Sequence, residues 1–121
     1  EVYDYRNIEV TIDEQGVFKV KMNESLAVAL LTNLLKNAFV HNIDGGHIRI
    51  TITKNGITFR NSGVEHPLDK EHIFERFYQG SKKEGSTGLG LAIADSICRL
   101  QHLNIKYYFE QNEHCFEISQ S

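Results

Sequence analysis

Residues 23–61 read NESLAVALLTNLLKNAFVHNIDGGHIRITITKNGITFRN, and this stretch decides the fold. The asparagine at its start is a suitable N-cap. The residues after it are rich in helix formers and contain no breaker, so we expect one long helix from 24 to about 41. Residues 47–53 and 57–61 alternate apolar and polar side chains on either side of Asn55-Gly56, a pair that suits a tight turn. The stretch therefore predicts a helix followed by a β-hairpin.

The flanking sequence extends this pattern in both directions. Residues 8–13 and 17–22 also alternate, around a glycine-containing turn, and predict a hairpin before the helix. Residues 89–101 regain helical periodicity, and 104–110 with 113–119 predict a last hairpin. The order β-β-α-β-β-α-β-β predicts an α+β sandwich in one domain, with helices on one face of a mixed or antiparallel sheet.

Composition narrows the class of protein. The chain has 121 residues and a formal net charge of −3, without a long cluster of lysine and arginine, so nucleic acid is not an expected partner. No apolar run approaches the roughly 20 residues that a membrane-spanning helix needs. Cys98 and Cys115 stand apart in apolar settings and predict buried packing residues in a reducing, cytosolic compartment. The chain begins without methionine, so we expect a piece of a longer protein.

Two asparagines interrupt the long apolar helix. Asn33 and Asn37 are four residues apart and share one face, which His41 extends by another turn. Buried amides without partners cost about 1–3 kcal/mol each, so these two need partners. The residues alone leave two interpretations open. Both amides could bond to backbone or to a neighbouring loop, or an amide oxygen could bind Mg²⁺, a hard cation that prefers oxygen ligands.

A glycine-rich stretch, Gly85-Ser-Thr-Gly88-Leu-Gly90, directly precedes the second helix. Glycine lets backbone approach a ligand closely, and a helix start attracts phosphate. The polar residues 80–88 predict a mobile loop. Neither a P-loop nor a dinucleotide fingerprint fits, because position 86 is serine and position 93 is isoleucine. These glycines could equally end a loop and allow tight helix packing.

Four motifs in fixed order resemble the catalytic domain of sensor histidine kinases, a member of the GHKL ATPase group that includes DNA gyrase and the mismatch-repair ATPases. They are Asn33-Leu-Leu-Lys-Asn37-Ala for the N box, Asn61-Ser-Gly63 for G1, Phe74-Glu-Arg-Phe77 for F and Gly85-Ser-Thr-Gly88-Leu-Gly90 for G2. The resemblance covers essentially the whole chain. It implies a two-layer α/β sandwich of the Bergerat type, with a mixed, mostly antiparallel sheet and a flexible ATP lid.

The resemblance also implies a site for ATP and Mg²⁺. Asn37 would bind Mg²⁺, and Asn33 would lie beside the phosphates, which makes these two the expected catalytic residues. Asn61 would accept a hydrogen bond from the adenine amino group, although the family usually has aspartate there. The other expected nucleotide-binding residues are His41, Gly63, Phe77, Lys82, Gly85, Gly88, Leu89 and Gly90.

Two further departures from the family pattern bear on nucleotide affinity. Val40 replaces the usual lysine of the N box, so Lys82 or another cation would have to reach the phosphates. Glu65 replaces the second G1 glycine. Both changes, with Asn61, lower the affinity that the sequence predicts.

The implied activity is transfer of the γ-phosphoryl group of Mg-ATP to a histidine on a separate dimerisation domain in two-component signalling. Hydrolysing cousins carry a glutamate at the position of Asn33, and an amide cannot accept a proton as a general base, so the kinase branch is favoured. The expected partners are the parent protein's own phosphoacceptor domain and a response regulator. The parent is expected to be a homodimer, and it could be anchored in the inner membrane with this domain in the cytoplasm.

Two alternatives remain open from the sequence. The chain could be a nucleotide-binding regulatory module with weak or no transfer activity, or a serine kinase of the anti-sigma-factor type. No histidine of the chain lies in a phosphoacceptor motif, and the remaining ones predict surface or turn positions: His47, His66, His72, His102 and His114.

Overall fold

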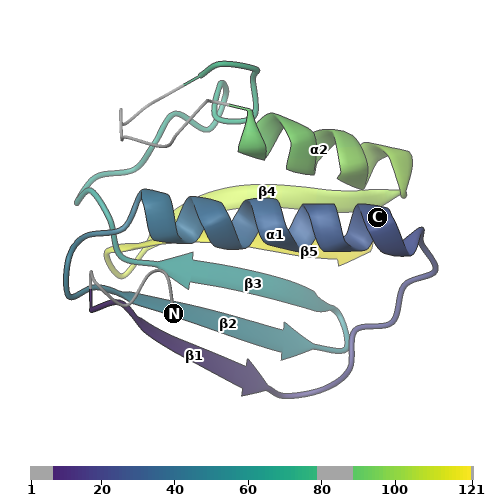
Figure 1. The fold of residues 1–121 in the computed structure, drawn as a ribbon, viewed down its shortest axis with the longest axis horizontal. Coiled ribbons are helices and arrows are strands. Elements are labelled where there is room, and N and C mark those ends of the chain that lie inside the picture. The colour runs from purple at the N-terminus through teal and green to yellow at the C-terminus, as the bar shows by residue number, and fades with distance from the viewer. Residues whose placement is uncertain (1–6, 79–88, 121) are drawn as a thin grey trace.

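The computed structural model describes residues 7–78 and 89–120. Two layers make up this part of the chain, a sheet and a pair of helices that lie against one of its faces (Figure 1). The elements, in chain order, are β1 (Glu9–Glu14), α1 (Glu24–Val40), β2 (His47–Thr53), β3 (Gly56–Asn61), α2 (Gly90–Leu100), β4 (Leu103–Glu110) and β5 (Glu113–Gln120).

Within the described residues the strands form one sheet in the order β1-β2-β3-β5-β4. The β1–β2 pair is parallel, whereas β2–β3, β3–β5 and β4–β5 are antiparallel. The predicted α+β class, with a mixed and mostly antiparallel sheet covered by helices on one face, is therefore confirmed.

The predicted N-terminal hairpin is wrong. Residues 17–22 form no strand, and β1 instead pairs in parallel with β2, with Val10 opposite Ile48, so that α1 is the crossover between them. Alternation identifies an extended segment but not its partner. In residues 17–22 the alternation has another cause, because Phe18, Val20 and Met22 pack against the main core on the way to α1.

The other elements agree with the sequence to within one or two residues. Asn23 caps α1 as expected, since its Oδ1 accepts a hydrogen bond from the Leu26 amide at 3.1 Å. The helix ends after Val40, where the His41 amide still donates to the Asn37 carbonyl oxygen. This places Asn37 and His41 on the last turn of the helix, beside the start of β2.

The main core fills the space between the helices and the sheet. The helices contribute Leu30, Leu34 and Ile97, which pack in one cluster with large apolar side chains of β3 and β5, including Phe59 and Phe116. Cys98 and Cys115 are both free and buried, which confirms their prediction as packing residues. The helix layer and the sheet thus hold α1, β3 and β5 in fixed relative positions, and one end of this sandwich carries the candidate site.

Candidate functional site

A pocket opens where the end of α1, the end of β3 and the start of β5 meet the segment that follows β3 and the start of α2. Three residues that the sequence predicts as ligands for nucleotide or Mg²⁺ lie in its wall, namely Asn37, His41 and Asn61. The rest of the lining is mainly apolar and comes from Val64, Leu68, Ile73, Tyr78, Leu91, His114 and Phe116. A mostly apolar pocket with a few placed polar groups is typical of a small-molecule site.

Asn61 contributes a buried acceptor without a partner. It ends β3, opposite Ile48 on one side and His114 on the other, and only 2% of it is exposed. Its Nδ2 donates to the Ser62 carbonyl oxygen at 2.7 Å, which fixes how the amide is turned. Its Oδ1 is the single buried side-chain oxygen or nitrogen in residues 7–78 and 89–120 that has no hydrogen-bond partner. Such an atom costs free energy unless a ligand supplies a donor.

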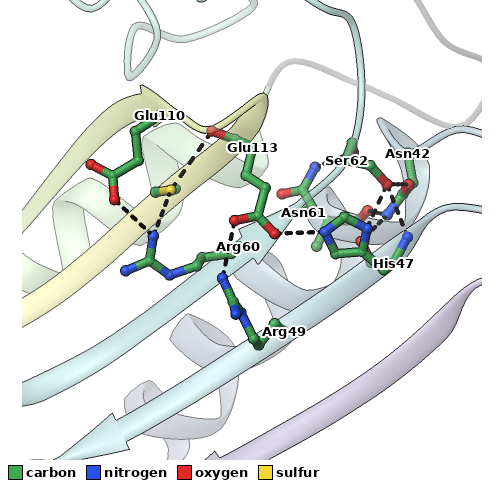
Figure 2. Close-up of polar contacts among 10 residues, drawn as sticks. Asn42, His47, Arg49, Arg60, Asn61, Ser62, Glu110 and Glu113 are labelled. Carbon is green, nitrogen blue, oxygen red and sulfur yellow. Dashed lines mark hydrogen bonds and ion pairs between the residues drawn. The ribbon is translucent and has the colours of Figure 1, made fainter.

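A buried polar network fixes Asn61 relative to α1 (Figure 2). Asn42, which is fully buried, accepts from the Ser62 hydroxyl at 2.6 Å through Oδ1 and donates to the carbonyl oxygens of Ala38 and His47 through Nδ2. The Ser62 hydroxyl oxygen in turn accepts from the His47 amide at 2.9 Å. The end of α1, the start of β2 and the end of β3 are therefore tied together, so the Asn37 and Asn61 walls of the pocket keep their spacing.

At Gly63 the backbone lies so close to its neighbours that a residue with a side chain would not fit. A Cβ at this position would lie 2.9 Å from the His41 carbonyl oxygen and 3.1 Å from Cδ2 of His114. The chain can therefore run between the end of α1 and β5 only because residue 63 lacks a side chain.

Asn33 lies one turn before Asn37 on α1, but it is not one of the residues that line the pocket. Its Nδ2 donates to the Ala29 carbonyl oxygen at 2.8 Å, as the backbone-bonding interpretation expected. Its Oδ1 would lie 3.3 Å from a Cβ at Gly90, so it faces the first turn of α2 rather than the pocket wall. The structure thus brings the N box and the start of α2 together at one edge of the pocket.

Other predicted residues lie apart from the wall or outside the described part. Phe77 is 66% exposed, has a φ of 64°, and lies under the Arg76 guanidinium, 5.2 Å from the ring centroid. Leu89 is half-buried just before α2, and Leu91, two residues further on, lines the pocket instead. Lys82, Gly85 and Gly88 lie outside the described residues.

The prediction of a surface or turn position for His114 is wrong. Only 4% of this residue is exposed, and it forms part of the pocket wall. Its Nε2 lies 2.7 Å from the Val64 carbonyl oxygen and its Nδ1 lies 2.7 Å from the Tyr107 hydroxyl. Burial lowers the pKa of His114. The signal was present in the alternation of the last strand, where His114, Phe116 and Ile118 share the inward face.

His47 is half-buried on the opposite face of the sheet and bonds to Glu113 at 2.6 Å, and Arg49 bonds to the same carboxylate at 3.1 Å (Figure 2). His66, His72 and His102 are exposed, as predicted. Within the described residues no group of three or more histidine, cysteine, aspartate or glutamate side chains could hold a metal ion. A metal at the pocket would therefore depend on amide oxygens and on the ligand itself. In the same part of the chain, neither helix is long and apolar enough to span a membrane.

Comparisons with known proteins agree with this geometry. Residues 22–119 match the family model described as histidine kinase-, DNA gyrase B- and HSP90-like ATPase. The catalytic domain of the histidine kinase ThkA superimposes with a TM-score of 0.81 at 25% identity, covering 97% of this chain and 80% of that one. ThkA has also been crystallised in complex with the response regulator TrrA; that structure gives a TM-score of 0.75 at 25% identity and covers 99% of this chain and 36% of that one.

Curated relatives are sensor histidine kinases. Sensor histidine kinase RppB of Synechocystis sp. is 44% identical over 84 residues, which are 62% of this chain and 18% of that protein. Sensor-like histidine kinase SenX3 of Mycobacterium bovis is 34% identical over 104 residues, which are 78% of this chain and 25% of that protein. The chain therefore spans a quarter or less of these two relatives. It belongs to the histidine kinase-, DNA gyrase B- and HSP90-like ATPase family, as a catalytic ATP-binding domain of the sensor histidine kinase type.

Proposed function

We propose that this chain binds Mg-ATP in the pocket between α1, β3 and β5, and that within a longer protein it donates the γ-phosphoryl group to a histidine of a separate dimerisation domain. One observation supports ATP above the others. The unpartnered Asn61 Oδ1 offers a buried acceptor in an apolar pocket of a family of ATPases, and the adenine amino group is a matching donor.

The orientation of the Asn61 side-chain amide favours adenine over guanine. Because Nδ2 is held by the Ser62 carbonyl oxygen, the group left for a base is an oxygen, which only accepts. Adenine presents an amino donor at C6, whereas guanine presents a carbonyl oxygen there, and two acceptors repel each other. A site that leaves buried polar groups unpaired against the wrong ligand discriminates strongly. We therefore expect ATP to bind at least about tenfold more tightly than GTP.

Mg²⁺ fits the residues present through Asn37. An amide oxygen is a hard ligand of the kind that Mg²⁺ accepts, and Asn37 lies in the pocket wall on the last full turn of α1. Bound with ATP, the ion would neutralise phosphate charge during transfer. Asn37 would hold the phosphate end of the nucleotide near α1 while Asn61 holds the base.

Asn33 supports transfer rather than hydrolysis. Its amide is fixed by the bond to the Ala29 carbonyl oxygen and cannot take a proton from water, so no general base stands at this position. Glu65, one of the departures from the family pattern, is exposed and does not line the pocket, so it leaves the wall intact. We expect the isolated chain to bind ATP and turn it over slowly.

Titration calorimetry tests the binding step. We expect heat with Mg-ATP, little with Mg-GTP, and loss of Mg-ATP binding in Asn37→Ala with an unchanged melting temperature. Thr32→Ala, an exposed change on the same helix, is the matched control and should bind as the wild type does. Absence of heat at millimolar Mg-ATP in the wild type would refute the proposal, and unchanged affinity in Asn37→Ala would refute the Mg²⁺ assignment.

Phosphorylation of a supplied dimerisation domain tests the transfer step. With label on the γ-phosphate, we expect an acid-labile phosphohistidine on that domain. Binding without any transfer would favour the regulatory module, and an acid-stable phosphoserine on a protein substrate would favour the anti-sigma-factor type of kinase.

The crystallised ThkA–TrrA complex supports a response regulator as the partner downstream. We propose the same kind of partner here, in a homodimeric parent whose kinase domain lies in the cytoplasm and which could be anchored in the inner membrane. Lys82, Gly85, Gly88, Leu89 and Gly90 keep their predicted roles in phosphate binding and the ATP lid, and Phe77 keeps its predicted role in the nucleotide site.

A further inference from the structure

Residues 64–68 belong to no helix or strand and contribute part of the pocket wall. Val64 and Leu68, at the two ends of this segment, both line the pocket. An irregular segment lacks the repeated backbone bonds of a helix or sheet, so its position depends on individual contacts. Two buried side chains of the neighbouring hairpin, Tyr107 on β4 and His114 on β5, supply such contacts at both ends.

The hydrogen bonds form one chain whose direction is fixed. The Leu68 amide, which can only donate, lies 3.0 Å from the Tyr107 hydroxyl, so that oxygen accepts. The Tyr107 proton is then available to His114 Nδ1, 2.7 Å away. The Val64 carbonyl oxygen, which can only accept, lies 2.7 Å from Nε2, so Nε2 carries the imidazole proton. All donors and acceptors of the chain are satisfied by a single neutral tautomer of His114.

We propose that His114 and Tyr107 are positioning residues of the nucleotide pocket, which clamp both ends of residues 64–68 and hold the wall in place only while His114 is the neutral Nε2–H tautomer. The inference rests on the proposed function, because it concerns affinity for Mg-ATP. It assigns no contact with the phosphates, and neither residue takes part in the transfer step.

Protonation would disrupt this clamp. A second proton on Nδ1 turns that atom into a donor facing the Tyr107 hydroxyl, whose own proton then has no acceptor in a buried place. Burial lowers the pKa of His114, the bond to Val64 opposes this, and a charge on His66 lowers the pKa further. The neutral tautomer, and with it the wall, is therefore retained above about pH 6.5 and lost as the pH falls through the lowered pKa.

We assign the pH dependence to the clamp after considering the titratable and charged groups around His114. Tyr107 faces it from β4, His66 lies in the clamped segment, and His41 lines the pocket from the end of α1. On its own strand, Cys115 and Glu113 are neighbours, and the Glu113 carboxylate is bonded to His47 and Arg49. None of the described residues that line the pocket is acidic, so no carboxylate in that wall would stabilise an imidazolium.

Four variants of the chain test the proposal. Tyr107→Phe removes the acceptor of the Leu68 amide, and His114→Phe removes both imidazole bonds while keeping a ring. His114→Gln retains a donor and an acceptor but cannot titrate near neutral pH. Glu65→Gln, an exposed change in the same segment, is the matched control. For each we would measure the Kd for Mg-ATP from pH 5.5 to 8, hydrogen exchange at the Leu68 amide, and the melting temperature.

We expect Tyr107→Phe and His114→Phe to speed exchange at Leu68 and to raise the Kd by about tenfold or more at pH 7.5. The wild type and Glu65→Gln should lose affinity as the pH falls through the lowered pKa of His114, and His114→Gln should lose much less. The comparison with His114→Gln removes the nucleotide's own titration. If His114→Phe does not fold, Tyr107→Phe and His114→Gln still decide the question.

The outcomes distinguish a failure of the proposed function from a failure of the clamp. Wild-type chain that binds no Mg-ATP would refute the proposed function. Wild-type chain that binds, with the same Kd in Tyr107→Phe and unchanged exchange at Leu68, would overturn the clamp alone. The same pH profile in the wild type and in His114→Gln would overturn the requirement for the neutral tautomer.

Discussion

A single atom shows how this domain exchanges stability for ligand recognition. Asn61 Oδ1 is buried without a hydrogen-bond partner, a state that costs about 1–3 kcal/mol. Its neighbour Nδ2 is satisfied by Ser62, so the amide cannot turn to relieve that cost without losing another bond. The free chain is therefore held in a form that a donor from a ligand would stabilise.

Asn61→Asp tests this exchange. A carboxylate would place a second oxygen where Nδ2 now bonds the Ser62 carbonyl oxygen at 2.7 Å, so we expect the free protein to lose about 1–3 kcal/mol of stability. The acceptor toward the base is kept, so affinity for Mg-ATP should stay equal or increase. Thermal unfolding with and without Mg-ATP measures both effects. A marked loss of affinity would mean that adenine is held elsewhere.

Gly63→Ala tests the passage between α1 and β5. The added Cβ would meet the His41 carbonyl oxygen at 2.9 Å, and a backbone oxygen on a helix end cannot swing aside as a side chain can. We expect a loss of about 1–3 kcal/mol in stability and a strong loss of Mg-ATP binding, because both neighbours belong to the pocket. Calorimetric titration and denaturant unfolding would measure these effects. Unchanged affinity would show that the pocket tolerates movement of α1.

At the scale of elements, the pocket depends on how the ends of α1, β2 and β3 are joined. Asn42 joins all three, because it donates to the carbonyl oxygens of Ala38 in α1 and His47 in β2 and accepts from the hydroxyl of Ser62, which follows β3. Gly46 lies close against it, since a Cβ there would be 2.2 Å from Asn42 Oδ1. The junction is thus both hydrogen-bonded and tightly packed, and it carries the spacing between Asn37 and Asn61.

Asn42→Ala should therefore weaken the fold and the site together. Removing the amide leaves the carbonyl oxygen of Ala38 and the hydroxyl of Ser62 without this partner, so we expect stability to fall by about 2–4 kcal/mol. Urea unfolding checks the magnitude, and titration with Mg-ATP in the folded fraction checks the pocket. Ile43→Ala, at the exposed neighbouring residue, is the control and should change neither by much. Equal effects of the two changes would show that the network has no special role.

The elements also show what the sequence could and could not predict. Helix α1 and the β2–β3 hairpin were predictable because a capped helix and an Asn-Gly turn are local signals. The parallel partner of β1 was not, because pairing across the α1 crossover is non-local, and the alternation of residues 17–22 reflects packing on the core. Asn37, His41 and Asn61 came from motifs, whereas His114 required attention to which face of its strand it occupies.

For the whole molecule, the pocket is a product of global folding. Its walls come from the end of α1, β3, residues 64–78, the start of α2 and β5, which span the chain from residue 37 to residue 116. No local part of the chain can form it alone. A ligand that binds this pocket and not the unfolded chain must therefore stabilise the entire domain by an amount set by its concentration relative to Kd.

The two thiols provide a direct measure of that coupling. Cys98 of α2 is 1% exposed and Cys115 of β5 is 0% exposed, on different elements and in different layers. Burial raises the pKa of Cys98 to about 11 and also raises the pKa of Cys115, so the folded chain holds little reactive thiolate near neutral pH.

We expect a thiol reagent to label both residues only through unfolding. Mg-ATP at about 100 times its Kd should then slow labelling about a hundredfold, equivalent to about 2.7 kcal/mol. Labelling in denaturant gives the intrinsic rate, and the slowing should vanish in Asn37→Ala. Rapid labelling of the folded chain, or a rate that Mg-ATP leaves unchanged, would contradict the link between pocket and fold.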